Sequence, residues 1–146
     1  MYKGEPTIGI KFFSLLEKSN EFTSELGKAA LASGKLEAEL IILLKSKNIA
    51  VKFERATLGF LIELLEKNDL LDKNMISALR TVSKQRNYIT HNLYALFIDQ
   101  LDETIMGKNN LIDTDVLLYV DRAWQLKENL NGLADIIKQR NERHPR

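Results

Sequence analysis

One short segment carries side chains that could together cleave a phosphodiester: residues 85–94, with the sequence QRNYITHNLY. Asn87 and His91 lie four residues apart, and His91 and Tyr94 three apart, so on a helix the three share a face. Arg86 comes five residues before His91, about 140° around the helix, so these two do not meet side by side on one undistorted helix. A second copy packed across a twofold axis would place Arg86, Asn87 and His91 of both chains around a shared groove.

Such a groove suits RNA cleavage without a metal. Attack by a ribose 2′-hydroxyl on the adjacent phosphate needs a group that titrates near neutrality, which is His91. It also needs a fixed positive charge that binds the phosphate oxygens, and the guanidinium of Arg86 can donate two hydrogen bonds to them. Asn87 could orient Arg86 and His91. The need for a 2′-hydroxyl would exclude DNA. A single helical histidine is more often a hydrogen-bonded structural residue, so spacing alone leaves both interpretations open.

Charge is distributed unevenly, although the net charge is only +1 from 21 basic and 20 acidic residues. No Asp or Glu occurs from residue 73 to residue 98, a segment that holds four basic side chains, Lys73, Arg80, Lys84 and Arg86. This bias fits a solvated helix face or a local anion-attracting surface. For the second case we predict Arg80, Lys84 and Tyr94 as RNA-binding residues.

Composition excludes several other classes of site. The chain has no cysteine and only two histidines, which excludes disulfides, thiolate zinc sites, iron–sulfur clusters and a histidine-rich metal site. No phosphate-binding G-x-x-x-x-G-K loop occurs. We therefore expect no metal and no cofactor. No apolar run reaches the 18 or so residues of a membrane span and no signal-peptide core follows Met1, so we expect no membrane association and a cytoplasmic location.

The elements that must position these residues are helices. Of 146 residues only Pro6 and Pro145 are proline, so the interior lacks the strongest helix breaker. Apolar residues recur at helical spacing, which predicts an all-α fold: a single domain over residues 1–146, built as a bundle of four to five helices. The charged tail, about residues 140–146, is expected to fray.

The helices follow from caps and apolar stripes. One stripe runs from Ile8 to Leu44 and stops near 47–48, and residues 49–55 form a connector with some strand propensity. Thr57 caps a helix that ends at 68–69, and Asp72 caps the helix that carries the chemistry. A turn at 107–110 precedes a last long helix from 113 or 114. We expect its apolar side at Val116, Val120, Ala123, Trp124, Leu130 and Ile137.

The segment from Arg86 to His91, RNYITH, resembles the R-N-x-x-x-H motif of the HEPN superfamily (higher eukaryotes and prokaryotes nucleotide-binding). Residues 36–40 (LEAEL) resemble the family's earlier helix, and residues 57–62 followed by 70–71 resemble the segment before its motif helix. The resemblance covers roughly residues 12–97. It implies a helical bundle that dimerises, with the motif at the interface, and it makes Arg86 and His91 the catalytic pair with Asn87 beside them. Some toxin members carry a tyrosine two residues after the histidine, where this chain has Leu93.

Many members of this family are endoribonucleases that need no metal, so the resemblance implies cleavage of single-stranded RNA by a homodimer. A toxin–antitoxin or defence role would add an antitoxin protein as a partner. The alternative is a non-catalytic dimeric regulatory or nucleotide-binding module, resembling the group of a mannitol-operon regulator. A third possibility is an antitoxin or partner-binding bundle without a ligand.

Overall fold

The computed structural model describes residues 13–52, 56–91 and 113–143. Four helices lie in these ranges: α2 (Asn20–Ser46), α3 (Leu58–Lys67), α4 (Lys73–His91) and α7 (Asp113–Arg143). Residues 13–18 are also helical, and none of the described residues forms a strand. The all-α class predicted from the sequence is confirmed.

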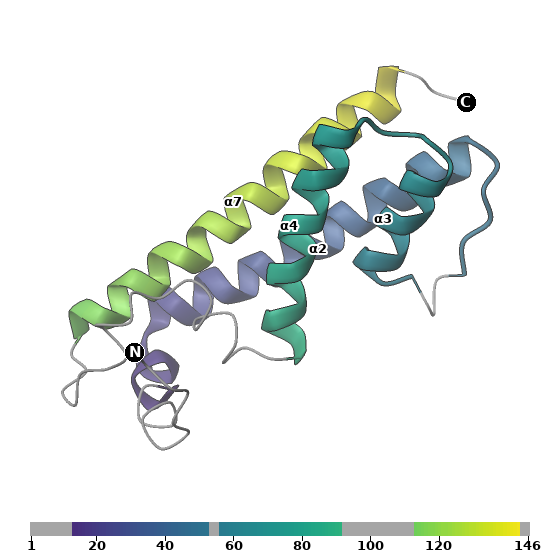
Figure 1. Ribbon diagram of the computed structural model, residues 1–146. Helices are drawn as coiled ribbons and strands as arrows, with labels where there is room; N and C mark the ends of the chain where they lie inside the picture. The colour runs from purple at the N-terminus through teal and green to yellow at the C-terminus, as the bar shows by residue number, and fades with distance from the viewer. Residues whose placement is uncertain (1–12, 53–55, 92–112, 144–146) are drawn as a thin grey trace.

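The two long helices, α2 and α7, lie side by side and run in the same direction (Figure 1). On each helix four buried residues recur every seventh position: Phe22, Ala29, Leu36 and Leu43 on α2, and Val116, Ala123, Leu130 and Ile137 on α7. A seven-residue apolar repeat keeps one stripe of each helix facing its neighbour over many turns. The repeat therefore explains why α2 and α7 pack along most of their length.

Capping residues set the ends of the shorter helices. The Thr57 hydroxyl accepts a hydrogen bond from the Phe60 N–H and begins α3, as the sequence predicts. The Asp72 carboxylate accepts one from the Met75 N–H, at 2.8 Å, and begins α4. At the break between these helices Asp69 has φ 52°, a left-handed conformation that asparagine and aspartate adopt more readily than most residues.

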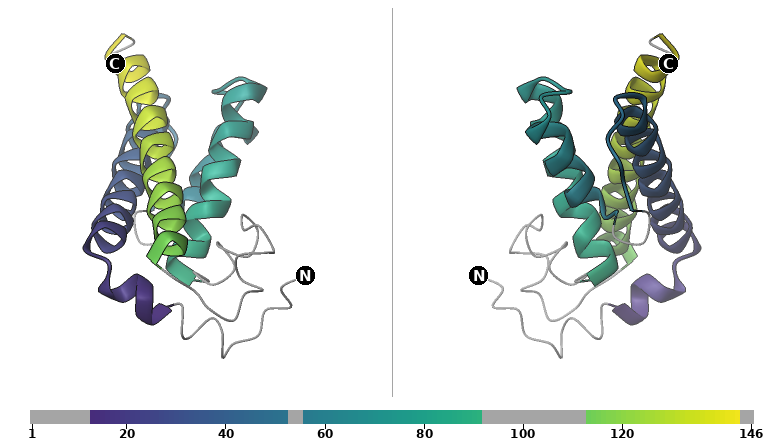
Figure 2. Two further views of the ribbon diagram at one scale, coloured as in Figure 1. Left: turned by 90° about the vertical axis from the view of Figure 1, so that its left-hand side faces the viewer. Right: turned by 90° about the vertical axis from the view of Figure 1, so that its right-hand side faces the viewer.

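The second layer is α3 and α4, which pack against each other and against α2 (Figures 1 and 2). In the turned views α4 leans away from α7, so the two diverge toward one side (Figure 2). Side chains from all four helices share one apolar core, which includes Leu36, Leu61, Leu79 and Leu130, each fully buried. This core holds α4 along one side only and leaves its opposite side to solvent.

Two sequence expectations need correction. Trp124 is not a core residue: 42% of its surface is exposed, because it lies beside the buried stripe of α7. The first stripe is not one continuous helix, since Ser19 interrupts it and caps α2 through the Phe22 N–H.

Within the described ranges, no helix combines the length and the apolar character needed to cross a membrane. The long helices α2 and α7 carry charged residues along their outer sides, together with a few exposed apolar residues such as Leu31 and Ile42 on α2 and Leu117 on α7.

Candidate functional site: the basic face of α4

One side of α4 carries polar and basic residues in a regular register. Residues 73, 77, 80, 84, 87 and 91 follow one another at alternating intervals of four and three. At 100° per residue this spacing keeps all six within about 40° of one line along the helix. Five of them, Lys73, Ser77, Arg80, Lys84 and Asn87, have exposed side chains. We call this line the basic face of α4.

A groove of about 610 Å³ runs beside the first half of the basic face. Its α4 wall is formed by Lys73, Ile76, Ser77, Arg80, Thr81 and Lys84, and its other wall by Glu66, Asp69 and Leu71. The groove therefore brings together both basic residues that the sequence predicts as RNA ligands, Arg80 and Lys84. Three basic and two acidic side chains leave it with a net positive charge.

Arg80 makes an ion pair and a hydrogen bond with Glu66 across the groove, from α4 to α3. Both side chains are about half exposed, at 51% and 54%. Exposed ion pairs of this kind contribute only about 0–1 kcal/mol, because water solvates both partners nearly as well. A phosphate oxygen can therefore replace the Glu66 carboxylate at Arg80 at little cost.

Arg86 lies on a different side of α4, among residues that face the core. Its Nε donates a hydrogen bond to the Ser33 hydroxyl at 3.2 Å, and its Nη2 lies 3.2 Å from Glu37 Oε1. The side chains of Arg86 and Glu37 are only 23% and 22% exposed, and Ser33 is buried. Arg86 thus joins α4 to the middle of α2, and its guanidinium is held in place by a hydroxyl and a carboxylate.

The remaining predicted site residues lie toward the end of α4. Asn87 is exposed and occupies the basic face, next along the chain to Arg86. Position 91 is the last residue of α4 and falls in the same register as residues 80 and 84. Tyr94 lies outside the described residues. The structure therefore places the predicted residues on two sides of one helix: Arg86 toward α2, and positions 80, 84, 87 and 91 on the basic face.

Sequence reasoning missed several residues of this site. Ser77 and Lys73, the latter counted among the basic residues but not predicted as a ligand, extend the basic face, and the four-and-three spacing back from position 91 would have placed both on it. Ser33 and Glu37 hold Arg86, but no local pattern could have identified them, because they come from α2 and lie about fifty residues away in sequence.

In the described ranges, no three Asp, Glu, His or Cys side chains gather in a way that could hold a metal ion. The α4 wall of the groove carries lysine, arginine and hydroxyl side chains, which are ligands for anions, and the opposite wall carries the carboxylates of Glu66 and Asp69.

Comparison with known proteins adds no relative: no family model, no curated protein and no solved structure matches the chain significantly.

Proposed function

We propose that the protein is an endoribonuclease that cleaves single-stranded RNA without a metal, by attack of a ribose 2′-hydroxyl on the adjacent phosphate. The observation that carries this proposal is the basic face of α4. It combines exposed cations, an amide and position 91, the site of one of only two histidines in the chain, in a single register. Cations along the helix would bind the phosphates of an RNA backbone, and a histidine would act as the acid or base at the phosphate that reacts.

The length of the basic face suits a strand rather than a single nucleotide. From residue 73 to residue 91 the helix rises about 27 Å, at 1.5 Å per residue. Lys73, Arg80 and Lys84 would contact successive phosphates, which gives affinity without sequence preference. His91, at the end of this track, would exchange the proton of the attacking hydroxyl or of the leaving oxygen.

In this proposal Arg86 binds the phosphate whose negative charge rises in the transition state. A guanidinium fixed by Ser33 and Glu37 is preorganised, so little ordering of the side chain is needed when the charge develops. Since positions 86 and 91 differ by about 140° around α4, one chain does not bring both groups to one phosphate. We therefore include a homodimer, in which two copies of α4 line one cleft. Arg86 of one copy and His91 of the other would then act on the same phosphate.

A defence or toxin–antitoxin role follows from the same proposal, with an antitoxin protein as a further partner. A nuclease that binds the RNA backbone without sequence preference would damage its own cell if it were unrestrained. Expression of the wild-type chain should then slow growth, and His91→Ala should relieve the effect.

The experiment that tests the activity is incubation of the purified protein with single-stranded RNA in EDTA. Wild type should cleave, and His91→Ala should lose about 100-fold or more of the rate, as general acid–base catalysis contributes that much. Equal cleavage by both proteins would overturn the proposal, because it would point to a contaminating nuclease.

A second candidate is a non-catalytic dimeric regulatory or nucleotide-binding module, and the contacts of Arg86 favour it. A guanidinium that joins α4 to α2 has a structural role whether or not it binds phosphate. Glu37→Gln separates the two functions, since it removes the ion pair and keeps the guanidinium. If Arg86 is catalytic, Glu37→Gln should lose less of the cleavage than Arg86→Ala, because it loosens the guanidinium without removing it, with both variants assayed where they are fully folded.

A further inference from the structure

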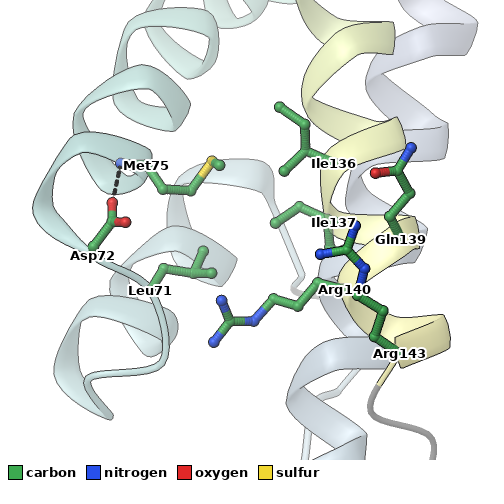
Figure 3. A pocket seen from close by; sticks show the side chains of 8 residues that line it. All are labelled: Leu71, Asp72, Met75, Ile136, Ile137, Gln139, Arg140 and Arg143. Carbon is green, nitrogen blue, oxygen red and sulfur yellow. Dashed lines mark hydrogen bonds between the residues drawn. The ribbon is translucent and has the colours of Figure 1, made fainter.

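A second cavity, of about 230 Å³, lies at the opposite end of α4 from position 91. It lies between the last turns of α7 on one side and the loop before α4 with the first turn of α4 on the other (Figure 3). Met75 in this wall is sixteen residues, or about 24 Å along the helix, before position 91. The cavity is therefore separate from the proposed reaction site.

The floor of this cavity is apolar. Leu71 and Ile137 are buried, and Met75 and Ile136 complete the surface from α4 and α7. Ile136 is half exposed, with 49% of its surface open to solvent, although it lines the cavity. An apolar group placed against Ile136 and Met75 would remove this surface from water, which is favourable.

Two guanidinium groups stand at the rim. Arg140 extends from α7 toward the loop that carries Leu71, and Arg143 folds back along α7 beside Ile137 (Figure 3). The Arg140 Nη2 donates a hydrogen bond to the Leu70 carbonyl at 2.9 Å, which fixes the direction of that side chain. A guanidinium has five N–H donors, so Arg140 keeps others for a ligand.

No carboxylate neutralises Arg143 within residues 13–52, 56–91 and 113–143. The one carboxylate in the cavity wall, Asp72, accepts the Met75 N–H that caps α4. The N-terminus of α4 adds a positive potential at the same place. The rim therefore attracts an anion, while the apolar floor suits an apolar group.

We infer that this cavity binds a small organic oxyanion with a short apolar body: a carboxylate or a phosphate monoester held by Arg140 and Arg143, with its chain against Met75 and Ile136. The volume is below the roughly 300–1,000 Å³ typical of sites for drug-sized ligands, so the ligand is small. Such a ligand would connect the end of α7 to the start of α4, the helix that carries the proposed reaction site.

The test is a titration of the ¹⁵N-labelled full chain with hexanoate and with hexyl phosphate at constant ionic strength, followed by NMR. We expect saturable shifts centred on Leu71, Met75 and residues 136–143. The relative affinity of the two probes then identifies the headgroup. Hexanol keeps only the apolar chain and acetate only the carboxylate. Each should bind at least about tenfold more weakly than hexanoate.

Variants make the test specific. Arg143→Gln should raise the Kd at least about tenfold, because it removes the charge and the charge-assisted hydrogen bonds that the guanidinium donates to the anion. Ile136→Ser should weaken the binding of hexanoate and leave acetate unchanged. Arg122→Gln, an exposed arginine about 31 Å earlier on α7, is the matched control and should bind as wild type.

The inference is overturned if neither probe gives saturable shifts at the cavity, or if Arg122→Gln weakens binding as much as Arg143→Gln. It does not depend on the proposed nuclease activity. His91→Ala should bind hexanoate as wild type does, so a failure of one proposal leaves the other standing.

Discussion

At the scale of single residues, the two arginines of α4 that have described carboxylate partners are in different environments. Arg86 meets Ser33 and Glu37 where all three side chains are largely shielded from water. Arg80 meets Glu66 at the surface, where both partners are about half exposed. The shielded Arg86–Glu37 ion pair therefore holds α4 against α2. The exposed Arg80–Glu66 ion pair leaves Arg80 able to exchange its carboxylate partner for a phosphate.

Arg86→Ala should lower the free energy of unfolding by about 1–3 kcal/mol, because it leaves the Glu37 carboxylate shielded from water without its cation. Arg80→Ala, the matched control on the same helix, should cost no more than about 1 kcal/mol. Urea denaturation of both variants measures the difference. A cost for Arg86→Ala no larger than that for Arg80→Ala would contradict the structural role of the Arg86 contacts.

At the scale of helices, α2 and α7 are joined by polar contacts as well as by the apolar stripe. Lys127 Nζ lies 2.8 Å from Glu25 Oε2 and 5.8 Å from the centre of the Trp124 ring. At the other end of the pair, the Asn141 side chain donates to the Glu39 carbonyl at 3.0 Å. Both contacts join residues 102 positions apart, which is the register expected of two parallel helices.

The Glu25–Lys127 contact makes stability depend on pH. The hydrogen bond and the charge of Lys127 lower the pKa of Glu25 from its ordinary 4.5, against a smaller opposing effect of burial. The same contact raises the pKa of Lys127 above its ordinary 10.5. The ion pair thus makes its full contribution to the free energy of unfolding between pH 4.5 and pH 10.5. This contribution is lost as the pH falls below 4.5 and Glu25 takes up a proton.

Glu25→Gln should therefore have a lower melting temperature than wild type at pH 7. The difference between the two melting temperatures should become smaller as the pH falls from 4.5 toward 2. Glu63→Gln, an exposed glutamate on α3, serves as the control and should follow wild type. Thermal unfolding across this pH range measures the effect. A difference between Glu25→Gln and wild type that stays constant down to pH 2 would argue against the ion pair.

The stripe between α2 and α7 should carry most of the energy of the pair. Leu36→Ala removes a fully buried side chain and should cost about 2–5 kcal/mol of stability. Leu31→Ala, on the outer side of the same helix with 73% of its surface exposed, should change stability by no more than about 0.5 kcal/mol. Equal costs in chemical denaturation would mean that the stripe does not face α7.

At the scale of the whole molecule, much of the fold follows from local patterns. Thr57 and Asp72 cap the helices predicted for them, because an N-cap acts within one turn and is visible in the sequence. Trp124 was predicted wrongly, since its neighbours in the stripe are apolar and only the packing of α7 on α2 shows that it faces outward. Local spacing also predicted that Arg86 and position 91 diverge, whereas the partners of Arg86 depend on how α4 packs on α2.

The cavity and the proposed reaction site lie at opposite ends of α4, whereas the groove beside the first half of the basic face is lined, like the cavity, by Leu71. Near the first turn are the arginines of α7 and the apolar cavity, and along the exposed side runs the basic face that ends at position 91. The exposed side chains of the basic face lie on the side of α4 away from the core, and we propose that a long anionic strand binds there. The central claim is that this strand is RNA and that its own 2′-hydroxyl performs the attack.

Mass spectrometry of the products tests that claim most directly. A single-stranded RNA and its fully 2′-O-methylated counterpart are incubated with wild type and with His91→Ala in EDTA, and the new ends are weighed. Internal attack predicts fragments ending in a 2′,3′-cyclic phosphate from the RNA with wild type, none from the methylated strand, and a large loss with His91→Ala. Cleavage of the methylated strand, or fragments with a 3′-hydroxyl and a 5′-phosphate, would contradict it.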